Sequence, residues 1–142
     1  MKTNNWALAG LVVRLQLGIL FLMAGWWKVF DLGASEHAQR FFVDAFSESW
    51  IPVWLLWPLG VTIPFLELAA GLLLLVGWRI RATVTVLGLL LAVTTYGHAL
   101  LEPLFDIDGH TFTRLALVVF LLLAPAAGHR YSLDHVIGGE DS

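Results

Sequence analysis

The stretch PLGVTIPFLELAAGLLLLVGW, residues 58–78, decides the fold of this chain. Its only charged side chain is that of Glu67, and the rest is almost entirely apolar. A helix that crosses a lipid bilayer requires about 20 consecutive, predominantly apolar residues. The stretch therefore predicts a membrane-spanning helix.

Three further stretches of the sequence have the same character. Together with the first they predict spans over approximately residues 6–29, 58–78, 81–102 and 111–127. A membrane β-barrel would show short segments of alternating hydrophobicity, whereas these runs are unbroken. The sequence thus predicts an all-α integral membrane protein, folded as a single domain around a four-transmembrane-helix bundle.

The composition of the whole chain excludes several other classes of protein. Of its 142 residues 58% are hydrophobic and only 13% are charged, whereas about 25% are charged in a typical soluble domain. A soluble protein of this length could not bury so much apolar surface. The net charge of −3 provides no basic surface for nucleic acid. With no cysteine in the sequence, disulfides and thiolate metal sites are excluded as well.

Two segments outside the spans have their own patterns. Between the first two spans, Ser35 can cap a helix, and apolar residues then recur on one helical face: Ala38, Phe41, Phe42, Ala45 and Phe46. This pattern predicts an amphipathic helix over approximately residues 35–49 that lies in the membrane interface. Residues 128–142 are polar and are expected to form a loosely packed cytoplasmic tail.

The distribution of basic residues predicts an orientation. Four spans place both termini and the second loop on one side, together with Lys2, Arg79, Arg81 and Arg130. The opposite side has three basic residues among many acidic ones. The positive-inside rule therefore predicts cytoplasmic termini. All seven tryptophans fall near the expected span ends, where membrane proteins carry an aromatic belt.

Two charged side chains, Arg14 and Glu67, lie deep in the predicted spans. Arg14 follows Trp6 by eight residues, and Glu67 precedes Trp78 by eleven, which places them about 12 Å and about 16 Å from the inner boundary. Charges within a bilayer are costly and usually face a partner or a cavity. The matching depths predict an intramembrane Arg14–Glu67 pair, with a structural and a functional interpretation both open.

Small residues accompany these charges on the same helical faces. Gly18 and Gly25 recur in register with Arg14 and Lys28 in the first span. Gly60 and Gly71 recur in register with Glu67 in the second. Because small residues let membrane helices approach closely, the two stripes predict a packing seam between these spans.

A second polar cluster is expected near the outer side. It would combine Lys28, His98 and Arg114 with the loop residues Glu102, Asp106, Asp108 and His110. His98 can act as a base or as an interfacial hydrogen-bonding group, and Lys28 and Arg114 can be snorkelling anchors. The spacing of the acidic residues is common in loops, so no metal site is predicted.

The spans also restrict the cofactors that the chain can hold. A haem with two histidine ligands is not expected because His98 is the only clear intramembrane histidine, and no glycine-rich loop indicates a flavin. A quinone is compatible with the sequence. Arg14, Lys28 and His98 would then be the cofactor-binding donors, and Glu67 and His98 the catalytic proton carriers.

Four pieces of the sequence resemble the DoxX family of small four-helix membrane proteins. They are RLQLGILFLMAGWWKVF (14–30), FLELAAGLLLLVGWRIRATV (65–84), YGHAL (96–100) and GHRYSLDHVIG (128–138). The resemblance implies a four-helix bundle in the cytoplasmic (inner) membrane of a prokaryote. It also implies that Arg14, Lys28, Glu67 and His98 occupy the family's polar positions.

Three functions are compatible with this resemblance and with the residues. The first is a membrane subunit of a quinone-linked oxidoreductase, as in the sulfur-oxidising relatives that gave the family its name. The second is a non-catalytic accessory or anchoring subunit of a larger membrane complex. The third is a small transporter or proton pathway, although no inverted repeat is visible. The first two imply partner proteins, and the sequence leaves open the substrate, the oligomeric state and whether the chain is an enzyme.

Overall fold

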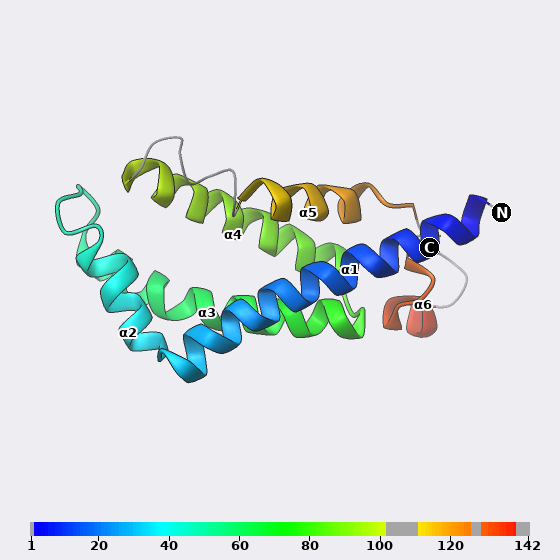
Figure 1. Ribbon diagram of the computed structural model, residues 1–142, viewed down its shortest axis with the longest axis horizontal. Helices are drawn as coiled ribbons and strands as arrows, with labels where there is room; N and C mark the ends of the chain where they lie inside the picture. The colour runs from blue at the N-terminus through cyan, green and yellow to red at the C-terminus, as the bar shows by residue number, and fades with distance from the viewer. Residues whose placement is uncertain (1, 102–110, 126–128, 139–142) are drawn as a thin grey trace.

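The computed structural model describes residues 2–101, 111–125 and 129–138, and every regular element in this part of the chain is helical (Figure 1). Two π-helical segments, η1 and η2, interrupt the series of α-helices. In chain order the elements are α1 (Lys2–Trp26), η1 (Trp27–Asp31), α2 (Ala34–Ala38), η2 (Gln39–Asp44), α3 (Val53–Val76), α4 (Ile80–Leu101), α5 (Thr113–Leu123) and α6 (Leu133–Gly138).

Three of these helical stretches are long and apolar enough to cross a membrane: Asn5–Asp31, Val53–Val76 and Ile80–Leu101. They correspond to the first three predicted spans, and they support a membrane protein. The predicted fourth span corresponds to α5, which has only 11 residues and a length of about 16 Å. This is short of the hydrocarbon core of about 30 Å, so the structure provides three candidate spans and one shorter apolar helix.

The early end of α5 has a local cause. Ala124 follows its last residue with an extended backbone, at φ −59° and ψ 130°. The residue before a proline is sterically disfavoured in the helical conformation, and Pro125 comes next in the sequence. The predicted span at 111–127 ran through this proline because its apolar composition continues on both sides.

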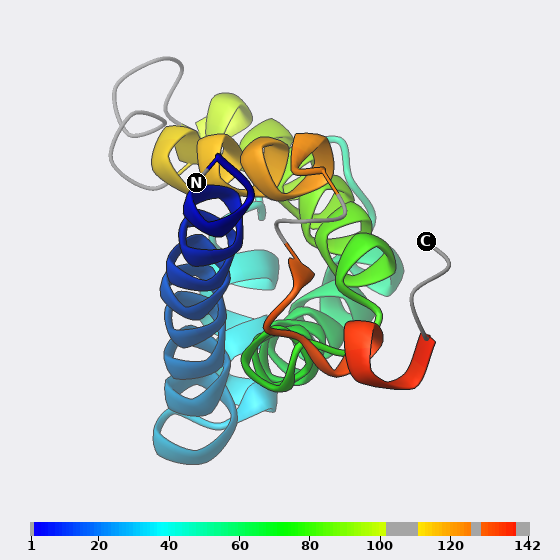
Figure 2. The same cartoon turned by 90° about the vertical axis from the view of Figure 1, so that its right-hand side faces the viewer.

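The four longer helices lie along the long axis of the molecule (Figure 1). Seen along the long axis in Figure 2, α1 and α4 are on opposite sides, with α5 above and α3 below. The N-terminus and α6 lie at one end, here called the tail end. The segment α2 crosses the opposite end, here called the α2 end.

The core is formed by apolar side chains of α1, α3, α4 and α5, among them Leu17, Phe21, Leu74, Leu87 and Leu121. Many other large apolar side chains point outward, and all seven tryptophans are exposed. Soluble monomers rarely expose extensive apolar patches. The outer surface is therefore suited to lipid.

The predicted packing seam between the first two spans is present. A Cβ atom added to Gly71 of α3 would lie 2.7 Å from the Cα of Leu22 and 2.8 Å from the carbonyl oxygen of Gly18. A Cβ added to Gly25 of α1 would lie 2.8 Å from the carbonyl oxygen of Pro64. The backbones of α1 and α3 thus approach too closely for any residue larger than glycine at these positions.

The predicted interfacial helix at 35–49 differs from the observed segment. It is α-helical only from Ala34 to Ala38 and continues as η2 to Asp44. His37 and Ala38 are buried, and a Cβ added to Gly60 of α3 would lie 2.6 Å from the Cα of Ala38. The segment therefore packs onto α3 near its N-terminal end, and its location in the membrane interface stays a prediction.

The expectation of a loosely packed tail is wrong for residues 129–138. The carboxylate of Asp134 accepts the backbone N–H groups of Arg79 at 2.7 Å and Ile80 at 2.8 Å. The N–H of Asp134 donates to the carbonyl of Gly77 at 3.0 Å. Asp134 thus caps the N-terminus of α4, where backbone donors have no partner within the helix.

Candidate functional site: a buried ion pair between α1 and α3

The charged pair inside the bundle joins Glu67 to Lys28. The Nζ atom of Lys28 donates to Oε2 of Glu67 at 2.6 Å. The guanidinium of Arg14 instead donates, through Nη2, to the carbonyl oxygen of Tyr131 at 2.7 Å. The predicted Arg14–Glu67 pair is therefore wrong.

The cause of this error is the length of α1, which extends past the turn between α3 and α4. The guanidinium of Arg14, rather than Trp6, lies against Gly77. Because Trp6 precedes Arg14 by eight residues, measuring depth from Trp6 placed Arg14 about 12 Å too deep. Lys28, near the other end of α1, is the residue that comes level with Glu67.

The glycine seam positions the two members of the pair. Gly25 lies three residues before Lys28, on the same face of the helix, and Pro64 lies three residues before Glu67. Because Gly25 brings α1 against the carbonyl of Pro64, the backbones are close where the two side chains meet. The π-helical segment η1 begins just before Lys28, and its end is marked by an N–H···O bond of 2.9 Å from Leu32 to Trp27.

The pair is largely removed from solvent. The side chain of Glu67 is 4% exposed and that of Lys28 is 20% exposed. Each member of such an ion pair depends on the other, because removing one partner leaves an uncompensated charge in an apolar environment. In chemical terms it is a proton donor and a proton acceptor in direct contact.

His37 is a third polar group at this end of the bundle, and the sequence pattern did not predict it as a site residue. It is 5% exposed, and its Nδ1 lies 2.8 Å from the carbonyl oxygen of Gly60. A carbonyl oxygen only accepts, so Nδ1 carries a proton. The sequence feature that could have indicated His37 is its position on the predicted amphipathic segment, four residues before Phe41 and on the same helical face.

The charge state of His37 follows from its surroundings. Burial lowers the pKa of His37 below its ordinary value, the hydrogen bond to the Gly60 carbonyl raises it, and the charges of Lys28 and Glu67 act in opposite directions. Because burial is the largest contribution, the neutral imidazole is favoured at neutral pH. Gly60, the hydrogen-bond partner of His37, lies seven residues, or about two helical turns, before Glu67 in α3.

The other predicted site residues do not join this group in the described part of the chain. His98 is exposed on α4, and Arg114 of α5 lies over the ring of Phe21, 5.6 Å from its centroid. Glu102, Asp106, Asp108 and His110 lie outside the described residues. The proposed catalytic role of His98 stays a prediction.

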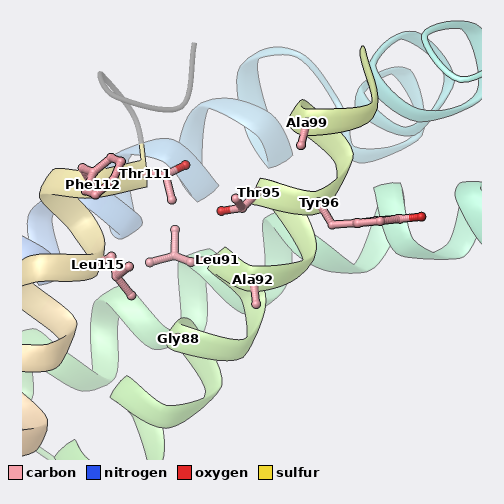
Figure 3. Close-up of a pocket in the computed structure, with 9 residues that line it drawn as sticks. All are labelled: Gly88, Leu91, Ala92, Thr95, Tyr96, Ala99, Thr111, Phe112 and Leu115. Carbon is pink, nitrogen blue, oxygen red and sulfur yellow. The ribbon is translucent and has the colours of Figure 1, made fainter. Parts of the chain in front are cut away.

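A cavity of about 450 Å³ lies between α4 and α5 (Figure 3). Its lining is mainly apolar, with hydroxyl groups contributed by Thr95, Tyr96 and Thr111. In Figure 3 the hydroxyls of Thr95 and Thr111 face the space between the two helices. None of the residues predicted to bind a quinone, Arg14, Lys28 and His98, lines this cavity.

Fold and site together define a class: a small helical membrane protein whose first two candidate spans are joined by a buried ion pair. A family model described as "Methylamine utilisation protein MauE" matches residues 6–105. The chain therefore belongs to the MauE family. Comparisons with curated proteins and with solved structures found no match.

This family corrects the resemblance to DoxX drawn from the sequence. Three of the four pieces behind that resemblance, at 14–30, 65–84 and 96–100, lie within the MauE match. They consist largely of apolar residues and glycine, whose order is constrained by helix packing in a membrane. Such pieces identify a membrane helix bundle but do not distinguish one family from another. Lys28, His37 and Glu67 all lie inside the matched residues.

Proposed function

We propose that this chain is a membrane accessory protein in methylamine utilisation, with Lys28, Glu67 and His37 as its working centre. The description of its family supports the physiological context. The observation that carries the proposal is the Lys28–Glu67 contact of 2.6 Å inside the bundle. Ionisable groups within a membrane-spanning helix are costly, and they are a functional-site hypothesis by default.

A purely structural role for the pair is the alternative. Apolar side chains of similar volume hold helices together as well as a buried ion pair does, and often better. The glycine seam already supplies close packing between α1 and α3 on both sides of Glu67. A role in proton exchange gives a reason for charges at this point that packing does not.

An accessory role suits the chemistry that the chain can supply. The sequence contains no cysteine, so thiol chemistry cannot come from its own side chains. We place the oxidation of the amine in a partner protein, and the proton exchange of Glu67 and Lys28 in this chain. The prokaryotic inner membrane as its location, and cytoplasmic termini, are part of this proposal.

A quinone-linked redox subunit is the second candidate. The α4–α5 cavity favours it, because Thr95 and Thr111 place hydroxyl donors in an otherwise apolar space. Thr95 and Thr111 line this cavity and do not belong to the ion pair, so variants at the two places distinguish the two proposed functions. Loss of function in Thr95→Val and Thr111→Val, with Glu67→Gln unaffected, would favour the quinone role.

Growth on methylamine as the sole nitrogen source tests the first proposal. A strain lacking the gene is complemented with the wild type, Glu67→Gln, Lys28→Met or the double variant Lys28→Met/Glu67→Met. The matched control is Glu36→Gln, since Glu36 belongs to an exposed ion pair with Arg40 at 2.5 Å. We expect Glu36→Gln to grow and both single variants and the double variant to fail.

Protein levels in the membrane distinguish failure of function from failure of folding. The double variant removes both charges, so it keeps no unpaired ion and is expected to accumulate normally. If it accumulates and supports growth, the pair is only structural. If the deletion strain itself grows on methylamine, the proposed physiological role is wrong.

A further inference from the structure

A second buried cation, Arg14, lies at the tail end and forms no ion pair with a carboxylate of the described residues. It is 5% exposed, and the ion pairs within the described ranges are Lys28–Glu67 and Glu36–Arg40. The acidic side chain whose charge acts on Arg14 is that of Asp134. Both carboxylate oxygens of Asp134 are already occupied by backbone N–H groups of Arg79 and Ile80. The charge of Arg14 is therefore compensated only by the carbonyl of Tyr131 and by Asp134 at longer range.

Two buried nitrogen atoms at this place have no hydrogen-bond partner in the described structure. They are Nε of Arg14 and Nε2 of His129. Nearly all buried polar atoms in proteins have a partner, so each such atom requires an explanation. The Nε–H group of Arg14 can only donate, which means that the missing partner is an acceptor.

Arg14 and His129 meet at one turn of the tail: Arg14 donates to the carbonyl of Tyr131, and the carbonyl of His129 accepts from the hydroxyl of Ser132. Burial lowers the pKa of His129, the charges of Arg81 and Arg14 lower it further, and Asp134 raises it. Two arginines thus act on one imidazole, whereas the single acid is committed to the cap of α4. Among these described groups the formal charges of Arg14, Arg81 and Asp134 sum to +1.

The tail end also has the surface of a membrane interface. Trp78 and Tyr131 are 46% and 47% exposed, and Val136 and Ile137 of α6 are 77% and 68% exposed. Exposed Trp and Tyr are typical of the headgroup level of a bilayer, and a short apolar face beside basic residues suits the same place. Anions at this level are chiefly phosphates.

We propose that Arg14, Arg81 and His129 form a binding site for a phosphate group, carried by a phospholipid headgroup or free in solution. The planar guanidinium of Arg14 offers its Nε–H to one phosphate oxygen, and Arg81 supplies a second positive charge. His129 donates from Nε2 in the tautomer, or the charge state, that the anion stabilises. The site lies at the opposite end of the bundle from Lys28 and Glu67, and it is independent of their function.

Thermal unfolding of the full chain in uncharged detergent micelles tests this site. Inorganic phosphate is titrated in one arm and phosphatidylglycerol is added to the micelles in the other, both against chloride at equal ionic strength. We expect a saturable rise in the unfolding midpoint in at least one arm. Native mass spectrometry of the same samples should show one adduct of the corresponding mass.

Variants at Arg81 and His129 test whether these two residues belong to the phosphate site. Arg81→Gln, at an exposed position that leaves the fold intact, should raise the half-saturating concentration by about tenfold, as expected for one charge-assisted contact. His129→Gln provides a second test that does not alter a formal charge at neutral pH. The matched control is Arg40→Gln, an exposed arginine at the α2 end whose loss should change nothing.

The outcomes separate the sources of the phosphate. Stabilisation in both arms indicates recognition of the phosphate group itself, and stabilisation by the lipid alone indicates a headgroup site. If neither arm exceeds the chloride control, or if Arg81→Gln behaves like the wild type in both, the proposal is wrong. The two buried nitrogens are then hydrated by water only.

Discussion

The buried cations at the two ends of the bundle have different kinds of partner. At the α2 end, the Lys28 ammonium contacts a carboxylate at 2.6 Å. At the tail end, the Arg14 guanidinium contacts a backbone carbonyl at 2.7 Å, and the nearby carboxylate of Asp134 caps α4 instead. Among the residues that the structure describes, the first arrangement pairs its cation with a carboxylate, whereas the second does not. The comparison teaches that burial alone does not define a site, because the partner decides what the charge can do.

The largest expected effect comes from removing one member of the complete pair. Glu67→Ala leaves Lys28 buried without a counter-charge, and we expect the free energy of unfolding to fall by about 3–5 kcal/mol. An SDS titration in mixed micelles measures it. The double variant Lys28→Met/Glu67→Met is the control and should remain within about 1 kcal/mol of the wild type. A small loss in Glu67→Ala would mean that the two ends do not differ in the way proposed.

A second prediction concerns the glycine that brings the pair together. In Gly25→Ala the new methyl group would overlap the backbone of α3, so α1 must shift, at a cost of about 1–3 kcal/mol in the same titration. Gly88→Ala is the control, since a Cβ at Gly88 has its nearest neighbour at an ordinary 3.5 Å. Equal stability of the two variants would contradict the close approach at the α2 end.

The tail end can be weakened through its cap. Asp134→Ala removes both acceptors of the Arg79 and Ile80 N–H groups, and the loss of such a cap costs about 0.5–2 kcal/mol. Hydrogen exchange of these two amides should accelerate while amides of α3 keep their protection. Unchanged exchange at Arg79 and Ile80 would show that the tail does not cap α4 in solution.

The smallest expected effect is a pH dependence shared by both ends. Burial lowers the pKa of His37 and of His129, so on acidification the unfolded chain binds protons near the ordinary value of 6.5 before the folded chain does. Stability is therefore fully present above that pH and declines below it, until the folded histidines themselves are protonated. His37→Gln and His129→Gln should each flatten this decline. A decline of the same depth in both variants would exclude the two histidines as its cause.

The sequence predicted the spans well because their information is compositional. Apolar runs between charged ends determine where α1, α3 and α4 lie, and the glycine stripes predicted the seam between α1 and α3. The fourth span was overextended because Pro125 limits α5 by a steric effect that composition does not contain.

The polar partners were harder to predict, because they depend on the relative axial position of two helices. An error of about two turns in the depth of Arg14 placed it level with Glu67 in the prediction, whereas Lys28, 14 residues further along the chain, makes the contact. His37 and Asp134 were missed for a related reason: each contacts a backbone group, Gly60 in one case and Arg79 and Ile80 in the other. Backbone groups carry no side-chain signature in a sequence.

The cap that Asp134 provides to α4 also has a consequence for the order of events during synthesis. Asp134 follows Ile80 by 54 residues, so the turn between α3 and α4 leaves the ribosome well before its cap exists. In that interval the backbone N–H groups of Arg79 and Ile80 lack the carboxylate acceptor that they have in the folded chain. Arg14 contacts Tyr131, which follows it by 117 residues. The tail thus closes the bundle only after the three candidate spans have been synthesised, and a chain truncated before Asp134 would lack the cap of α4.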